Sequence, residues 1–149
     1  MAIQDSLYQE LILDHNRRPQ NYGRIGDANR HVEGNNPLCG DRLTLWVRLD
    51  GDMITDLSFE GSGCAISRAS ASLMTGSVKG KSRAEVEALL EQFQKLLNGS
   101  LPVSETGTLG KLAAFHGVCQ FPARVKCASL SWHALKAALG DTEAVVTTE

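Results

Sequence analysis

A thiol and a carboxylate stand two residues apart in the segment Asn36-Pro37-Leu38-Cys39-Gly40-Asp41. Pro37 fixes its own φ and favours an extended conformation at Asn36, while Gly40 permits a bend between the two functional side chains. Residues i and i+2 of an extended or turn segment point to the same side, so Cys39 and Asp41 can converge on one point. A thiolate beside a carboxylate is half of a four-coordinate metal site. The segment therefore predicts such a site, provided that further ligands exist.

The remaining cysteines are candidates for those ligands. Cys64 follows Gly61-Ser62-Gly63 at an expected strand-to-helix junction. Small residues there allow close backbone approach, and the free N–H groups of a helix start favour a thiolate. Cys127 lies in the first or second turn of an expected helix. Cys119 stands in an apolar loop, and we interpret it as a buried apolar side chain.

The candidate ligands are three thiolates and one carboxylate, those of Cys39, Asp41, Cys64 and Cys127. From spacing alone, Cys64 and Cys127 fit a buried apolar side chain as well as a ligand. Four such ligands suit tetrahedral zinc, and they equally suit the attachment of an iron–sulfur cluster. The set carries excess negative charge, which the nearby Arg124 and Lys126 would help to offset. The chain has no Cys-x-x-Cys pair, which excludes a zinc finger and a thioredoxin-like motif. Any metal site must therefore be assembled from distant parts of the chain.

The first half of the chain must position the turn that contains Cys39 and Asp41. Residues 4–17 have the apolar spacing of a helix that ends before Pro19. A short extended piece, 30–33, leads into the turn. Residues 43–49 alternate between apolar and polar, which predicts a half-buried strand, and residues 53–60 form its return strand, with Thr55, Leu57 and Phe59 on one face. This antiparallel meander needs helices on one of its faces.

The second half supplies those helices. Residues 65–78 are rich in alanine and serine and predict a closely packed helix. Ser82-Arg83-Ala84-Glu85 is a capping box before a strongly amphipathic helix that ends at Asn98-Gly99. The other expectations are a loop over 100–109, a short helical turn over 109–115, a helix over 122–139 that begins at Pro122, and a flexible tail over 141–149.

The composition predicts the class of protein. A chain of 149 residues without repeats or linkers fits one domain over 1–149. The net charge of −2, without a basic run, gives no support for nucleic-acid binding. No apolar run is long enough for a membrane span, and the start lacks the pattern of a signal peptide. We therefore expect a cytoplasmic protein with no membrane association.

These stretches together resemble the IscU/NifU-type iron–sulfur cluster assembly family, and within it the SufU branch. The motifs that carry the resemblance are Leu7-Tyr8, Ile12, Asp14-His15, Pro19, Asn21 and Gly23, the segment 36–41, the segment 59–67, Gly117-Val118, and the segment 121–128. Two features select the branch: Lys126 stands directly before Cys127, where IscU proteins carry a His, and the stretch between Cys64 and Cys127 is longer, with extra residues near 107–117.

The resemblance implies an α+β fold with a small three-stranded antiparallel sheet and about five to six helices packed on it. It also implies a zinc site made by Cys39, Asp41, Cys64 and Cys127. The implied activity is that of a zinc-dependent sulfurtransferase, with a SufS-type cysteine desulfurase as partner and further iron–sulfur assembly proteins downstream. Cys39 is implied to accept persulfide sulfur, once a His of the partner replaces it on zinc. Arg124 resembles a family arginine near the site, and we expect it to steer the thiolate or the partner.

Two other functions fit the same residues. One is a scaffold on which a [2Fe–2S] or [4Fe–4S] cluster is built and passed on, against which Lys126 argues. The other is a structural zinc module in a partner-binding domain. Its expected ligands would form a compact knuckle, whereas Cys39 and Asp41 lie in a turn-forming loop.

Overall fold

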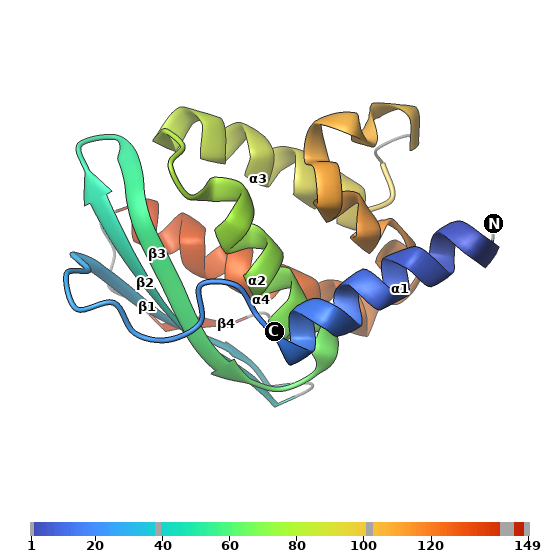
Figure 1. Ribbon diagram of the computed structural model, residues 1–149, viewed down its shortest axis with the longest axis horizontal. Helices are drawn as coiled ribbons and strands as arrows, with labels where there is room; N and C mark the ends of the chain where they lie inside the picture. Colours follow the sequence, from blue (N-terminus) through green and yellow to red (C-terminus); the bar gives the residue numbers. More distant parts are fainter. Residues whose placement is uncertain (1, 38–39, 101–102, 141–144, 148–149) are drawn as a thin grey trace.

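The computed structural model describes residues 2–37, 40–100, 103–140 and 145–147. Its helical segments are α1 (Ala2–Arg17), α2 (Ala65–Val78), α3 (Arg83–Leu97), the 3₁₀ segment η1 (Val103–Gln120) and α4 (Pro122–Leu139), and its strands are β1 (Arg30–Asn36), β2 (Asp41–Asp50), β3 (Met53–Ser62) and β4 (Val145–Thr147). Three strands are antiparallel, α2 and α4 pack on them, and α1, α3 and η1 pack on these two helices and on one another (Figure 1). This arrangement confirms the predicted α+β fold class.

The sheet has the strand order β3-β2-β1-β4, with β2 antiparallel to both of its neighbours. The apolar positions of β2 are buried in strict alternation, as predicted from the sequence. The predicted face of β3 is wrong at Thr55, which is exposed, whereas Ile54 is fully buried. The pairing register shifts between Arg48 and Leu49, so Leu49 lies opposite Ile54. This irregularity changes which residues of β3 point inward.

The end of the chain adds a strand that the sequence analysis did not expect. Residues 145–147 were expected to belong to a flexible tail, but they form β4, which runs parallel to β1. Gly34 lies opposite Val146 in this pairing. Valine and threonine favour extended backbone, and the outer edge of β1 offers unpaired N–H and C=O groups. Both properties favour a strand at this position.

Two helices cover the inner face of the sheet. α2 packs against β3, α4 packs against β1 and β2, and the two helices contact each other (Figure 1). The small residues of α2 let α4 approach it closely. At this contact Ser70 Oγ donates to the Ala128 carbonyl at 2.5 Å and accepts from Trp132 Nε1 at 3.2 Å. This packing brings the starts of α2 and α4 to the same end of the sheet.

The predicted capping box is confirmed at the start of α3, where Ser82 Oγ accepts from the Glu85 N–H and Glu85 Oε1 accepts from the Ser82 N–H. The prediction of a loop over 100–109 is wrong from residue 103 onward, because η1 begins there. η1 is interrupted at Gly110, whose φ is +55°. Phe115 in η1 is fully buried and meets Phe93 edge-to-face.

α1 is joined to α2 by a buried polar contact. His15 Nδ1 lies 2.7 Å from Ser72 Oγ, which also accepts the backbone N–H of Gln20 at 2.8 Å. Burial, and to a smaller extent the charge of Lys111, lower the pKa of His15 from its ordinary value of 6.5, and Asp14 partly opposes this effect. Burial of this contact therefore favours the neutral form of the imidazole.

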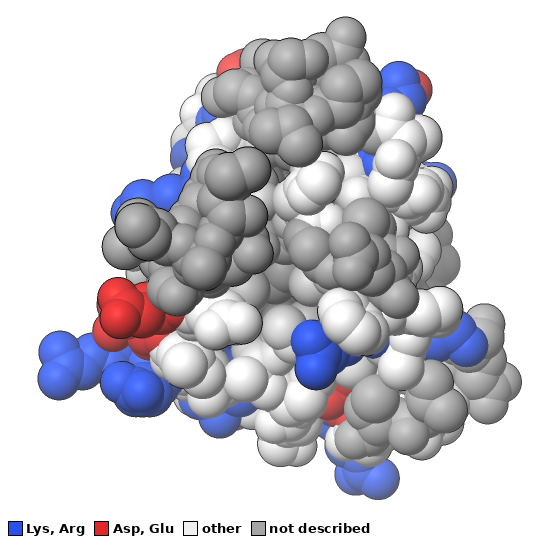
Figure 2. Space-filling view, turned by 90° about the vertical axis from the view of Figure 1, so that its right-hand side faces the viewer, with Lys and Arg blue, Asp and Glu red and all other residues white. Residues whose placement is uncertain are grey.

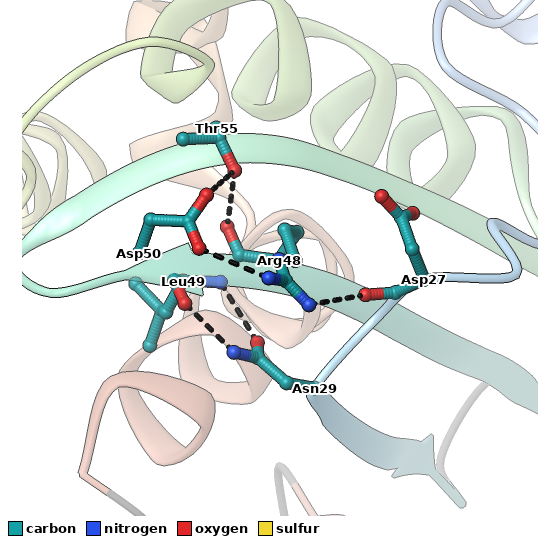
Figure 3. Close-up of polar contacts among 6 residues, drawn as sticks. All are labelled: Asp27, Asn29, Arg48, Leu49, Asp50 and Thr55. Atoms are coloured by element: carbon teal, nitrogen blue, oxygen red, sulfur yellow. Dashed lines mark hydrogen bonds and ion pairs between the residues drawn. The ribbon is translucent and has the colours of Figure 1, made fainter.

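Hydrogen bonds join the segment before β1 to the C-terminal end of β2. Figure 3 shows the amide of Asn29 with Nδ2 donating to the Leu49 carbonyl at 2.7 Å and Oδ1 accepting from the Leu49 N–H at 2.8 Å. Arg48 donates to the Asp27 carbonyl and pairs with Asp50 at 3.1 Å. The Asn29 side chain thus replaces a strand partner where the β1–β2 pairing ends.

The surface shows no extended region of one charge on the face drawn in Figure 2, as far as the described residues go. Their Lys and Arg side chains are scattered over this face, mostly toward its edge, with uncharged residues between them. In the described part of the chain, no helix combines the length and the apolarity that crossing a bilayer requires.

Candidate metal centre

Three of the predicted ligands converge in the structure. One ligand atom each from Asp41, Cys64 and Cys127 lies within 4.8 Å of the other two. Asp41 opens β2, Cys64 is the N-cap residue of α2, and Cys127 lies in α4. Bond lengths of about 2.0–2.3 Å around tetrahedral zinc imply ligand separations of roughly 3.5–3.8 Å. Small side-chain movements would therefore close these ligands around one ion, and the donor set suits zinc.

The carboxylate of Asp41 organises the centre. The residue is fully buried, and its Oδ1 accepts the backbone N–H of Cys64 at 2.8 Å. Its Oδ2 lies 3.9 Å from Cys64 Sγ. A carboxylate that accepts an N–H group at a helix start is stabilised by the helix dipole and satisfies one of the free donors of the first turn. Asp41 thus fixes the start of β2 against the start of α2.

The glycines before Cys64 make this approach possible. Gly63 has φ +138°, and a Cβ built on it would lie 2.9 Å from the Asp41 Cα and closer still to Oδ1. A Cβ on Gly61 would lie 2.6 Å from the carbonyl oxygen of Arg42. Any larger residue at either position would collide with the start of β2. The small residues of this segment predict close backbone approach, and in the structure the approaching group is the strand that begins with Asp41.

Asn36 is a further residue of the centre, which the sequence analysis did not identify. It is fully buried, and its Nδ2 donates to Asp41 Oδ2 at 3.0 Å and contacts Cys127 Sγ at 3.4 Å. From the sequence, Asn36 is predicted only to be the extended residue before Pro37. Burial alternates along β1, and Val32, Gly34 and Asn36 point inward. Extending the predicted strand to residue 36 would therefore have placed Asn36 on the inward face. An amide at an inward position predicts a buried polar partner.

The predicted positive charges lie on the first turns of α4. Arg124 is exposed, and its guanidinium lies 4.5 Å from the ring centroid of Phe121, itself 47% exposed. Lys126 is half-buried. Arg124 precedes Cys127 by three residues on the helix, which places the two on neighbouring parts of its surface.

Cys39, the fourth predicted ligand and predicted sulfur acceptor, lies outside the described residues, and so does the side chain of Cys119. The residues on either side of the Cys39 segment are described. Asn36 and Asp41 are the last pair in the β1–β2 register, and Gly40 has φ +72°. The position of Cys39 in the ligand set therefore remains a prediction from the sequence.

Comparison with known proteins adds a family match. Residues 7–145 match the family described as NifU-like N terminal domain. The zinc-dependent sulfurtransferase SufU of Bacillus subtilis (strain 168) is 43% identical over 139 residues, which cover 93% of both chains. The iron–sulfur cluster assembly scaffold protein IscU of Streptococcus pyogenes serotype M1 is 42% identical over 133 residues, which cover 89% of this chain and 82% of that protein.

A solved structure shows the same fold. The putative iron–sulfur cluster assembly scaffold protein for the SUF system from Fervidobacterium islandicum AW-1 superposes with a TM-score of 0.82 at 37% identity. The match covers 87% of this chain and 94% of that one. The relatives thus carry two kinds of name, sulfurtransferase and scaffold, at nearly equal identity.

Proposed function

This chain belongs to the family of NifU-like N-terminal domains, in the SufU/IscU group of iron–sulfur cluster assembly proteins, and we propose that it is a zinc-dependent sulfurtransferase that accepts persulfide sulfur from a SufS-type cysteine desulfurase. The observation that carries the proposal is the convergence of Asp41, Cys64 and Cys127 within 4.8 Å. The similarity to the Bacillus subtilis sulfurtransferase over nearly the whole chain supports the choice of activity.

The residues that would hold the metal are Asp41, Cys64 and Cys127, with Cys39 proposed as the fourth ligand. Zinc bound there would keep its thiolate ligands deprotonated at neutral pH. The chain itself supplies the arrangement of the ligands: β2 presents the carboxylate, and α2 and α4 each present one cysteine. A carboxylate is a harder ligand than a thiolate, so a set that contains Asp41 favours ligand exchange over permanent closure.

The proposed transfer is a thiol–persulfide exchange. The thiolate of Cys39 attacks the outer sulfur of the persulfide on the partner enzyme. A new S–S bond forms on Cys39 as the S–S bond of the partner breaks, and the partner cysteine leaves as a thiolate. Electrons balance without an added oxidant or reductant. Arg124, exposed at the start of α4, is proposed to guide the thiolate or the partner surface.

The second candidate is a scaffold for an iron–sulfur cluster. The 42% identity to the Streptococcus pyogenes scaffold protein favours it, and two cysteines with a carboxylate can also attach a cluster. Against it stands Lys126, which occupies the position before Cys127 where a scaffold of this type is expected to carry a His. A purely structural zinc module is the third candidate, and it requires no reactive thiol.

The test combines metal analysis of the purified protein with a cysteine desulfurase assay. We expect one tightly held zinc ion and strong activation of the desulfurase by the wild-type chain. Cys39→Ala and Asp41→Ala should abolish the activation, whereas Cys119→Ser, a matched thiol control, should keep both zinc and activation. Full activation by Cys39→Ala would refute the acceptor role. Little zinc, an iron–sulfur absorption band after reconstitution and weak activation would support the scaffold instead.

A further inference from the structure

The amide of Asn36 occupies an unusual position in the metal centre. The residue is fully buried, and its single NH₂ group contacts two predicted ligand atoms, Asp41 Oδ2 at 3.0 Å and Cys127 Sγ at 3.4 Å. Its other polar atom, Oδ1, is buried and has no hydrogen-bond partner among the residues that the structure describes. A buried amide normally satisfies both of its ends. Here Nδ2 donates to both predicted ligands, whereas Oδ1 accepts no hydrogen bond from the described residues.

The orientation of the amide follows from the charges around it. An amide turned the other way would place Oδ1 against a carboxylate and a cysteine sulfur, and two acceptors would then face each other. With the NH₂ group inward, each of its two N–H bonds meets one of the two ligands. Hydrogen bonds from a neutral donor reduce the repulsion between Asp41 and the thiolate form of Cys127 without adding a competing charge.

The backbone explains how Asn36 reaches a residue so distant in the sequence. β1 and α4 approach each other so closely that a Cβ on Gly34 would lie 3.1 Å from Leu130 Cδ1. Gly34 precedes Asn36 by two residues on the inward face of β1, and Leu130 follows Cys127 by three residues on α4. The absence of a side chain at Gly34 thus brings the end of β1 within hydrogen-bond reach of Cys127.

We propose that Asn36 is a positioning residue of the metal centre, which holds Asp41 and Cys127 at ligand spacing before the metal arrives and sets how tightly they bind it. The inference rests on the metal site proposed above. Groups that hydrogen-bond to metal ligands orient them, and their replacement typically weakens metal affinity about 10–100-fold. Asn36 differs from the usual case because one side chain orients two ligands from opposite parts of the chain.

The test replaces the amide and compares it with its neighbour. Asn36→Ala removes both donors, and Asn36→Leu removes them while filling the space. Asn35→Ala is the matched control, because Asn35 is the preceding residue of β1 and points to solvent. Zinc affinity is measured by competition with a chromophoric chelator, and the visible spectrum of the Co²⁺ form reports the ligand field. Urea unfolding of the metal-free proteins measures their stability separately.

We expect both Asn36 variants to bind zinc about 10–100-fold more weakly than wild type and to show an altered Co²⁺ spectrum. Asn35→Ala should match wild type in both. If the Asn36 variants fold and bind zinc within about threefold of wild type, with an unchanged Co²⁺ spectrum, the proposal is refuted, whatever their stability. If one variant does not fold, the other decides by the same criterion. Failure of the wild-type protein to bind any metal would instead overturn the proposed function.

Discussion

Replacement of Gly63 by alanine should damage both the fold and the metal centre, and a second glycine separates the two causes. Gly63 has φ +138°, and an added Cβ would meet the Cα and the carboxylate of Asp41. Gly80 also has a positive φ, +82°, but a Cβ there would have no neighbour within 4 Å. Gly80→Ala therefore introduces backbone strain alone, whereas Gly63→Ala adds a collision with a predicted ligand.

The magnitudes follow from these two environments. Backbone strain at Gly80→Ala should cost about 1–2 kcal/mol of unfolding free energy. At Gly63, strain of about 1–3 kcal/mol combines with overpacking of about 1–3 kcal/mol, for a total of roughly 2–6 kcal/mol. This is a large share of the roughly 5–15 kcal/mol that stabilises an ordinary domain. Relief of the collision requires Asp41 to move, which would break its 2.8 Å hydrogen bond with the Cys64 N–H.

The assay is urea unfolding of the metal-free proteins, followed by zinc competition on those that fold. We expect Gly63→Ala to be at least about 1 kcal/mol less stable than Gly80→Ala and to bind zinc at least about tenfold more weakly. Gly80→Ala should bind zinc like the wild-type protein. Equal stability of the two variants, together with unchanged zinc affinity in Gly63→Ala, would show that the close approach of Gly63 to Asp41 does not constrain the centre.

Two further predictions concern the helices that support the centre. Because burial lowers the pKa of His15 below 6.5, the folded state favours the neutral imidazole, so the protein should lose stability as the pH falls below about 6.5. Urea unfolding at about pH 7.5 and about pH 5.5 should show a smaller loss for His15→Gln than for the wild-type protein, and an equal loss would contradict this reasoning. Ser82→Ala removes the capping box of α3 and should lower the unfolding free energy by about 1 kcal/mol, in a range of about 0.5–2, without a change in zinc affinity.

The sequence predicted those parts of the fold that rest on local rules. Strand alternation identified β2, and the capping box and Pro122 identified the starts of α3 and α4, which the structure confirms. Thr55 was placed on the wrong face because a register shift depends on the pairing of two strands. β4 was missed because three residues are too short to show a period. η1 was missed in its first half because its sequence carries little helical periodicity.

The residue types and their spacing predicted only part of the ligand set. The spacing of Cys39 and Asp41 indicated half of a site, but nothing in the spacing of Cys64 and Cys127 indicates that they meet. Their relation came from the resemblance to a family, and the structure brings Asp41, Cys64 and Cys127 together. Asn36 escaped notice because an asparagine before a proline is an ordinary turn residue. Its contact with Cys127 forms only because α4 lies against β1.

The three converging ligands come from the start of one strand, the start of one helix and the body of another, far apart along the chain. A metal held by them would act as a reversible cross-link that closes most of the chain into loops. Such a cross-link stabilises the folded state by mass action, by about 4 kcal/mol when free metal exceeds its dissociation constant a thousandfold. Loss of the ion would remove this stabilisation of the folded state. Metal release and global unfolding of this protein would therefore be linked equilibria. A chelator would then act on it as a mild denaturant.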